Sequence, residues 1–313
     1  MKAVRLHARG GPEQLVYEDA PLPTPGPGEV RVRVSAAGIT PAELTWDETY
    51  QSADGGDRLP SIPGHDVSGT ADALGPGVSG LAVGDAVFGL VDFPRNGSAA
   101  EYVTVPAAAL AAKPRTVDNV AAAAVPLSAL TAWQALFDHG RLAAGDRVLI
   151  HGAAGGVGAY AVQLARWRGA EVIATASGRH AAFLTGLGAA AVIDYVTTPF
   201  EAVAKNVAVV LDTIGGATRD RSWQVLRPGG TLVTLPGPLP AGAAAAAGRP
   251  DAGGVFFIVR PSRPQLAEIA RLVDDGSLRP FVEAVYPLAE ARRAFERALA
   301  GHLRGKVVLR VVD

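Results

Sequence analysis

The chain has 313 residues, which is long enough for two domains that each bury a core. Its formal net charge is −1, which gives no reason to expect nucleic acid or an anionic membrane as a partner, and no apolar run is long enough to cross a bilayer. Cysteine is absent, which excludes disulfides, thiol nucleophiles and zinc sites built with thiolates.

The first third of the chain is predicted to be rich in β-strands. Residues 1–6 lack the apolar core and cleavage site of a signal peptide, so we expect a cytoplasmic protein. Three stretches alternate apolar and polar residues with period two, namely 30–34, 86–90 and 101–105. Clusters of proline and glycine separate them. Short strands with turns between them favour a small barrel or a partly open sheet.

Further along, the chain alternates between strands and helices. A helical pattern at 121–139 is followed by predicted strands at 147–150, 171–174, 191–193, 207–211 and 231–235. Helices are predicted to start between these strands, near residues 157, 179, 199 and 217. Alternation at this spacing predicts an α/β domain with a doubly wound parallel sheet and right-handed crossovers.

The last part of the chain is predicted to return to the β-rich domain. Residues 239–254 are rich in alanine and glycine without periodicity, which predicts a loop or flexible lid. An apolar run, two helices and a terminal strand follow, at 255–259, 265–274, 288–300 and 306–312. If the terminal strand pairs with the N-terminal strands, the doubly wound domain is an insertion. We therefore divide the chain into residues 1–118, 119–258 and 259–313.

The octapeptide HGAAGGVG at 151–158 lies between the strand at 147–150 and the helix that follows it. A strand, a glycine turn and a helix are the context of a nucleotide pyrophosphate site. Without a β-carbon at Gly155, backbone amides can approach a diphosphate, and the positive end of the helix attracts it. Gly158 would let the helix pack closely on the strand. Read against G-x-G-x-x-G, the first glycine is replaced by Ala153.

The end of the second predicted strand indicates NADP(H) rather than NAD(H). NAD-binding units place an acidic residue there, about 20 residues after the glycine turn, to bind the ribose 2′-hydroxyl. Here the strand is followed by Ser177 and Arg179, and no carboxylate stands at its tip. A hydroxyl and a guanidinium suit a 2′-phosphate. The alternative is that Ser177 caps the next helix and Arg179 is solvated in its first turn.

With these motifs, the chain resembles the zinc-independent quinone oxidoreductase branch of the medium-chain dehydrogenase/reductase superfamily from end to end. The matching segments are residues 37–44, 63–69, 83–89, 126–133, 151–158, 187–195 and 305–309. The resemblance implies a Rossmann NADP-binding domain inserted into a β-rich GroES-like catalytic domain. It also implies hydride transfer from NADPH to a quinone or an α,β-unsaturated carbonyl (enone or enoyl) substrate, usually in a homodimer.

The resemblance also implies which residues contact the cofactor. By matching position these are Thr131, Gly155, Gly156, Val157, Ser177, Arg179 and Tyr195. Four more candidates follow from the ends of later strands, namely Thr213, Leu235, Phe256 and Ile258. Thr40 stands where relatives commonly carry asparagine, or a zinc-ligand cysteine in the alcohol dehydrogenases. Its hydroxyl is a candidate to replace that polar contact.

We expect no metal. His65 resembles the histidine of the His-Glu pair that binds zinc in the alcohol dehydrogenases. A catalytic zinc needs three protein ligands, and in that family thiolates are normally among them. Because the chain has no cysteine and carries Thr40 at the first ligand position, His65 has no evident partner ligands. We expect His65 instead to be hydrogen-bonded within its turn.

Without a Lewis acid, the charge that develops on the substrate oxygen needs a hydrogen-bond donor or a proton. Tyr50 is the first candidate, because it follows the segment 38–44, and Thr40 is the second. The alternative for Tyr50 is an aromatic ring packed in a loop. Trp46 either shapes an aromatic substrate pocket or belongs to the core.

Two other functions stay open at this point. A redox-neutral cyclase or isomerase would use the same fold and nucleotide site, and a non-catalytic protein would bind NADPH alone. Thr40 and the lack of an unambiguous acid leave both open. The sequence motifs of the α/β-hydrolases, the P-loop proteins and the zinc proteases are absent.

Overall fold

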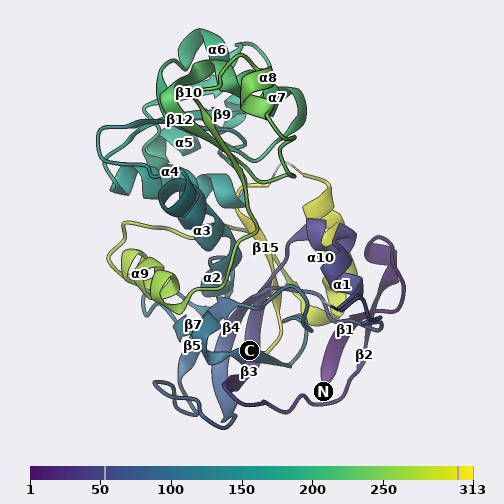
Figure 1. Cartoon of the computed structure of the whole chain (residues 1–313). Coiled ribbons are helices and arrows are strands. Elements are labelled where there is room, and N and C mark those ends of the chain that lie inside the picture. The colour runs from purple at the N-terminus through teal and green to yellow at the C-terminus, as the bar shows by residue number, and fades with distance from the viewer. Residues whose placement is uncertain (53, 302, 313) are drawn as a thin grey trace. The chain divides into compact units, whose positions relative to one another are not determined.

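The computed structural model describes residues 1–52, 54–301 and 303–312, and the chain folds as two compact units (Figure 1). The first unit combines Met1–Leu130 with Arg260–Asp313, and the second is Thr131–Val259. Both chain ends therefore belong to one unit, with the other inserted between them. The sequence-based division gave residues 119–130 to the inserted domain. They lie in the first unit instead, where α2 (Asn119–Ala123) packs against several of its strands.

The first unit is built from β-strands. These are β1 (Lys2–Leu6), β2 (Leu15–Asp19), β3 (Glu29–Gly38), β4 (Asp66–Leu74), β5 (Ala86–Leu90), β6 (Tyr102–Pro106), β7 (Leu110–Ala112), β14 (Val282–Pro287) and β15 (Lys306–Arg310). Within the described ranges, β14-β15-β3-β4-β5-β7 form a sheet in that order, and β6 pairs with β3. The terminal strand β15 runs antiparallel to β3, with Val308 opposite Gly38. This pairing confirms that the end of the chain returns to the N-terminal strands.

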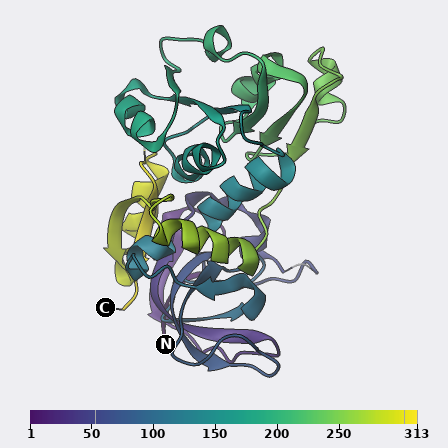
Figure 2. The same cartoon turned by 90° about the vertical axis from the view of Figure 1, so that its left-hand side faces the viewer.

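Helices pack on the strands of the first unit. Besides α2 these are the 3₁₀ segment η2 (Pro41–Thr45), α1 (Asp47–Tyr50), α9 (Arg263–Asp274) and α10 (Ala291–Leu299). Helix α9 begins at Ser262, whose hydroxyl accepts a hydrogen bond from the Gln265 amide, with a proline in the first turn. It packs on β7 and is the yellow-green helix of Figure 2. Helix α10 buries Phe295 in the main core of this unit.

The second unit is a parallel sheet with helices on both faces. Its strands are β8 (Arg147–Ile150), β9 (Glu171–Ala176), β10 (Ala191–Asp194), β11 (Val207–Asp212), β12 (Leu226–Thr234) and β13 (Gly253–Phe256). Every pairing is parallel, and the order is β10-β9-β8-β11-β12-β13. Counted from β8, this is the 3-2-1-4-5-6 order of dinucleotide-binding sheets.

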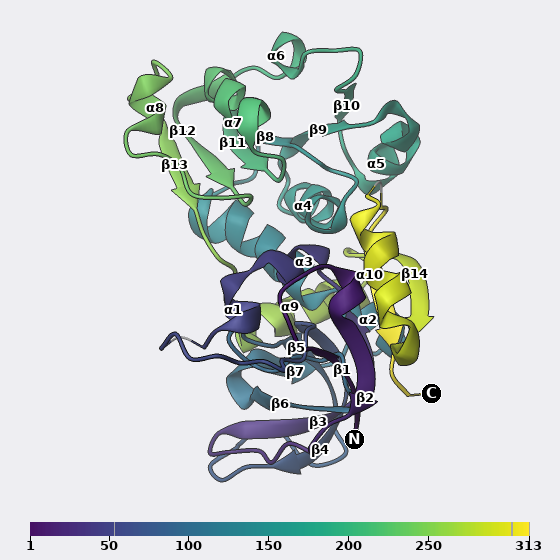
Figure 3. The ribbon, with the colours of Figure 1, turned by 90° about the vertical axis from the view of Figure 1, so that its right-hand side faces the viewer.

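The helices of this unit are α3 (Pro126–Trp133, which begins in the first unit), α4 (Gly156–Trp167), α5 (Ala181–Leu187), α6 (Phe200–Val203), α7 (Gly216–Ser222) and α8 (Ala243–Ala246). Helices α4 and α5 lie on one side of the sheet, and α6 and α7 on the other (Figure 3). The stretch 239–254, predicted as a plain loop, contains α8 and the start of β13. Its alanines pack against the core that includes Trp223 and Leu232, which explains the ordered structure.

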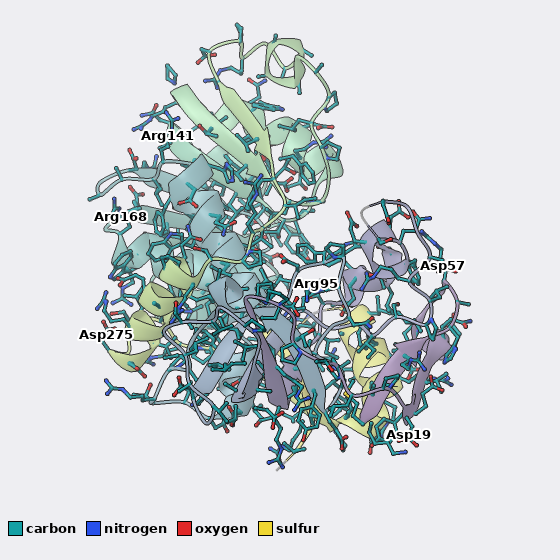
Figure 4. The ribbon with its side chains drawn as sticks, turned by 60° about the horizontal axis from the view of Figure 1, so that its bottom comes forward. Asp19, Asp57, Arg95, Arg141, Arg168 and Asp275 are labelled. Carbon is teal, nitrogen blue, oxygen red and sulfur yellow. The ribbon has the colours of Figure 1, made fainter. Side chains whose placement is uncertain are left out.

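Charged side chains lie mainly on the outside. Asp19, Asp57, Arg168 and Asp275, labelled in Figure 4, project from the ribbon and are exposed. No helix among the described residues has the length and apolar character needed to cross a membrane.

Candidate functional site

The carboxyl edge of the parallel sheet collects most of the predicted cofactor residues. In a parallel sheet, the residues that follow each strand meet at one edge. In strand order β8 to β13 these are Gly155, Gly156 and Val157; Ser177 and Arg179; Tyr195; Thr213; Leu235; and Phe256 with Ile258. Thr131 differs, because it lies on α3 with a buried side chain. The structure thus places all the predicted cofactor residues except Thr131 at or after the carboxyl ends of the parallel strands.

The turn after β8 depends on Gly152. Its φ is +65°, and a β-carbon there would lie 2.2 Å from Thr213 Oγ1. Thr213 follows β11 and donates a hydrogen bond to the His151 carbonyl at 2.9 Å. Ala153 is fully buried with a negative φ, and its amide donates to the Thr175 carbonyl. The fingerprint therefore tolerates Ala153, because Gly152 provides the left-handed conformation one residue earlier.

The rest of the turn leaves room for an anion. Gly155 is the N-cap residue of α4, and a β-carbon there would meet only the Gly152 carbonyl, at 3.4 Å. At Gly158 a β-carbon would lie 2.4 Å from that carbonyl oxygen and 2.6 Å from Ala153 Cα, so only glycine allows α4 to pack on the turn. An open helix N-terminus preceded by a glycine turn fits a nucleotide diphosphate.

Beneath the turn lies a buried histidine that the sequence analysis did not single out. His151 Nδ1 is 2.9 Å from Thr175 Oγ1, and Nε2 is 3.0 Å from Ser222 Oγ. Burial lowers the pKa of His151 to about 4, so the ring is neutral and joins β9 to α7 through two hydrogen bonds. His151 opens the octapeptide, which is the sequence signal that could have drawn attention to it.

At the end of β9, Ser177 and Arg179 lie in the positions expected from the sequence. Ser177 precedes the 3₁₀ turn η5 (Gly178–His180), but its hydroxyl makes no capping hydrogen bond. Arg179 is exposed, with Nε 3.3 Å from His180 Nε2. The nearby carboxylate of Asp194 ends β10 rather than β9, and its Oδ1 accepts from the Val196 amide. Tyr195, beside it, is 60% exposed.

A second polar cluster lies inside the first unit and surrounds Asp66. Asp66 is fully buried, Oδ1 accepts a hydrogen bond from the Leu127 amide at 2.6 Å, and Oδ2 lies 2.9 Å from Lys306 Nζ as an ion pair. Lys306 Nζ also donates to Thr40 Oγ1 at 2.8 Å. Burial raises the pKa of Asp66, and the charge of Lys306 works in the opposite direction. Thr40 is thereby joined to a buried ion pair.

Glu43 and His65 form a buried pair beside this cluster. Glu43 Oε2 accepts from the Gly64 amide at 2.7 Å and lies 3.3 Å from His65 Nε2. Burial raises the pKa of Glu43 to about 7 and lowers that of His65 to about 3. His65 Nδ1 is 3.2 Å from the Val91 carbonyl, which can only accept, so Nδ1 carries the proton of the neutral ring. His65 Nε2 is then an acceptor for the Glu43 carboxyl proton.

Two aromatic rings cover His65. Trp46 stacks on it with ring centroids 5.8 Å apart, and Phe93 meets it edge-on at 4.8 Å. Trp46 and Phe93 contact each other at 5.2 Å, and both are half-buried. Trp46 thus packs on His65 and Phe93, and its role in a substrate pocket stays a prediction.

Tyr50 does not fit its predicted role as proton donor. It is 3% exposed, its hydroxyl donates to the Leu44 carbonyl at 2.7 Å, and the Arg9 guanidinium lies 4.7 Å from its ring centroid. Burial also raises its pKa. The structure supports the alternative interpretation, a packed aromatic ring, because the hydroxyl proton is already bonded to the backbone. Thr40, half-buried and hydrogen-bonded to Lys306, is the remaining candidate.

The donor set around His65 does not suit a catalytic zinc. The side chain that pairs with His65 is Glu43, and the Glu43 oxygen next to His65 already accepts a hydrogen bond from the Gly64 amide. The position of the first zinc ligand is occupied by Thr40. Across residues 1–52, 54–301 and 303–312, no group of three or more histidine, aspartate or glutamate side chains is arranged to hold a metal ion. We derive no step through zinc.

A parallel 3-2-1-4-5-6 sheet with a glycine turn defines a dinucleotide-binding class of enzyme. Family comparison agrees. Residues 26–115 match the family model "Alcohol dehydrogenase GroES-like domain", and residues 187–309 match "Zinc-binding dehydrogenase".

Three relatives illustrate the similarity. The chain is 33% identical to the NAD(P)H oxidoreductase RTN4IP1, mitochondrial, of Danio rerio, covering 91% of this chain and 84% of that one. It is 30% identical to 2-methylene-furan-3-one reductase of Solanum lycopersicum, covering 90% and 71%. The solved quinone oxidoreductase of Coxiella burnetii is similar with a TM-score of 0.91 and 32% identity, covering 100% and 99%.

The chain therefore belongs to the medium-chain dehydrogenase/reductase superfamily, in its zinc-independent quinone oxidoreductase branch. It is an oxidoreductase of an NAD(P)H-binding Rossmann family.

The first prediction concerns the turn. Gly158→Ala should lower the free energy of unfolding by about 1–3 kcal/mol, because the new β-carbon meets fixed backbone atoms. It should weaken NADPH binding about tenfold or more. Urea unfolding of the protein without nucleotide and fluorescence titration with NADPH measure the two effects. Gly186→Ala in α5 is the matched control, since a β-carbon there meets nothing within 4 Å. Equal behaviour of the two variants would refute the close packing.

The second prediction concerns Glu43. Its pKa is raised from 4.5 to about 7, so the folded state binds more protons than the unfolded state between these values. The stabilisation by protonated Glu43 is therefore lost as pH rises through that window. Relative to Glu43→Gln, which cannot titrate, the native protein should lose up to about 1.4 kcal/mol of unfolding free energy per pH unit. Urea unfolding of both proteins from about pH 5 to about pH 8 tests this.

His65 does not confound this comparison. Its pKa is lowered from 6.5 to about 3, so its contribution is lost as pH falls below 6.5, and it is present in both proteins. Parallel stability curves for the native protein and Glu43→Gln would contradict a raised pKa at Glu43.

Proposed function

We propose that the protein is an NADPH-dependent reductase that transfers hydride to a quinone or an α,β-unsaturated carbonyl substrate without zinc. One observation carries the proposal: Thr40 has a half-buried hydroxyl that accepts a hydrogen bond from a buried lysine, Lys306. Such a hydroxyl suits a substrate whose oxygen becomes negative during reduction. The names of the relatives from Coxiella burnetii and Solanum lycopersicum support this substrate class.

The preference for NADP(H) rests on the end of β9. Ser177 has a hydroxyl that is not used for capping, and Arg179 has an exposed guanidinium. No carboxylate ends β9, where an NAD-binding unit would have one for the ribose 2′-hydroxyl. A guanidinium binds phosphate through charge and paired donors. Both features favour a 2′-phosphate over a free hydroxyl.

Bound NADPH supplies the hydride, and the chain supplies binding, orientation and a proton. The turn at Gly155, Gly156 and Val157 and the N-terminus of α4 would hold the diphosphate. Trp46 and Phe93 offer a face for a planar conjugated substrate. Thr40 donates its proton toward the substrate oxygen. Holding the reactants together while a donor stabilises the developing charge is sufficient for this reaction without a Lewis acid.

We further propose that the protein works as a cytoplasmic homodimer. Strand β13 is at the edge of its sheet, where a second copy could pair with the unpaired backbone groups. The formal net charge of −1 supports neither nucleic acid nor an anionic membrane as a partner.

The test of function is NADPH oxidation, followed by absorbance, with a panel of quinones, enones and 2-enoyl thioesters. Consumption of NADPH with any panel member, and formation of the reduced product, is the expected result. NADPH binding with no turnover on the whole panel would favour a binding protein. Conversion of a substrate at constant NADPH would favour a cyclase or isomerase.

The cofactor preference is tested by Arg179→Ala. Losing the guanidinium should raise the KM for NADPH about tenfold or more and leave the KM for NADH nearly unchanged, because only NADPH carries the 2′-phosphate. Arg115→Ala is the matched control, since that side chain is 92% exposed and also removes one positive charge. Equal use of NADH and NADPH by the native protein would refute the phosphate site.

A further inference from the structure

The contact between Lys306 and Thr40 suggests a role for a residue that hydride transfer alone does not need. Lys306 begins β15, and its side chain is 8% exposed. Its Nζ donates to Thr40 Oγ1 at 2.8 Å, and Thr40 is half-buried just before η2. The ammonium therefore lies deeper than the hydroxyl and directs one of its protons at the hydroxyl oxygen.

The direction of this hydrogen bond determines what Thr40 can do. An ammonium group only donates, so the Thr40 oxygen is the acceptor. Within the described part of the chain, Lys306 is the one hydrogen-bond partner of the Thr40 hydroxyl. The hydroxyl proton of Thr40 is therefore left for an acceptor that the protein itself does not provide.

Asp66 is the buried counter-ion of Lys306. It lies 2.9 Å from Lys306 Nζ and is fully buried. The other titratable groups that face Lys306 are Glu43 and His65, which form their own hydrogen-bonded pair. If Lys306 gave up a proton, Asp66 would remain as a buried carboxylate without a counter-ion, which is costly. The energetic cost of the unpaired carboxylate favours the return of a proton to Lys306.

We propose that Lys306 is a positioning residue for the reduction proposed above: it holds Thr40 as proton donor and replaces the proton that Thr40 gives. The inference rests on that proposed function. As the substrate oxygen becomes negative, the Thr40 O–H bond breaks and an O–H bond forms on the substrate. A Lys306 N–H bond breaks and the Thr40 O–H bond is restored. The neutral amine then takes a proton from water after the product leaves. Overall, the substrate gains one hydride and one proton.

Four variants distinguish an effect on proton transfer from an effect on folding. Thr40→Val removes the hydroxyl at similar volume, and Thr40→Ser retains it. Lys306→Met combined with Asp66→Asn removes both charges together, because the single change would leave a buried carboxylate unpaired. Lys2→Met is the matched control, since Lys2 pairs with Asp19 at 3.0 Å on the surface.

Steady-state kinetics with an enone, fluorescence titration with NADPH and urea unfolding without nucleotide are measured for each protein. Thr40→Val and the double variant should lose about a hundredfold in kcat, with NADPH affinity within about twofold. Lys2→Met should stay near the native values, and Thr40→Ser should retain more activity than Thr40→Val because it keeps a hydroxyl. In the double variant, raising imidazolium buffer at constant pH should restore kcat, because an external acid replaces the lost ammonium.

Three results would overturn the inference. An unchanged kcat in Thr40→Val or in the double variant would refute proton transfer from Lys306 through Thr40, while the proposed function would stand. A reduced kcat that does not respond to buffer acid, together with weakened NADPH binding, assigns Lys306 a purely structural role. Absence of turnover in the native protein with the whole substrate panel overturns the proposed function and this inference together.

Discussion

The burial of Asp66 is the constraint on which the first unit depends. A carboxylate that is removed from water needs partners, and here they come from distant parts of the chain: the Leu127 amide and Lys306 Nζ. Because these two groups pair with the Asp66 carboxylate, the start of β4 lies next to the start of β15 and the start of α3. The same lysine then reaches Thr40. The burial of Asp66 thereby also places a charged donor next to the hydroxyl that we propose as the proton donor.

In the second unit, the predicted nucleotide site is formed by the backbone rather than by side chains. Parallel strands bring their carboxyl ends to one edge, and the order reverses between β8 and β11. At that point Thr213 approaches the β8 turn so closely that only glycine fits at position 152. The nucleotide site therefore depends on positions where a side chain is excluded, whereas the site in the first unit depends on side chains that burial forces into pairs.

This difference explains what could be predicted from the sequence. Five strands of the second unit and their doubly wound parallel arrangement follow from periodicity and the glycine turn, and the return of β15 to β3 was anticipated. Local sequence could not reveal the Glu43–His65 pair or the Lys306–Thr40 bond, since they join residues about 22 and 266 positions apart in the chain. Tyr50 was wrong as a donor because sequence position does not show that Leu44 takes its proton.

Thr40 stands where the family resemblance implies an asparagine. An asparagine amide can donate a hydrogen bond, but it accepts through a different atom and does not hand over its proton. A hydroxyl accepts and donates through one oxygen, so a proton can enter from Lys306 and leave toward a substrate through the same atom. Threonine with a buried lysine behind it therefore favours proton transfer over simple polarisation of the substrate.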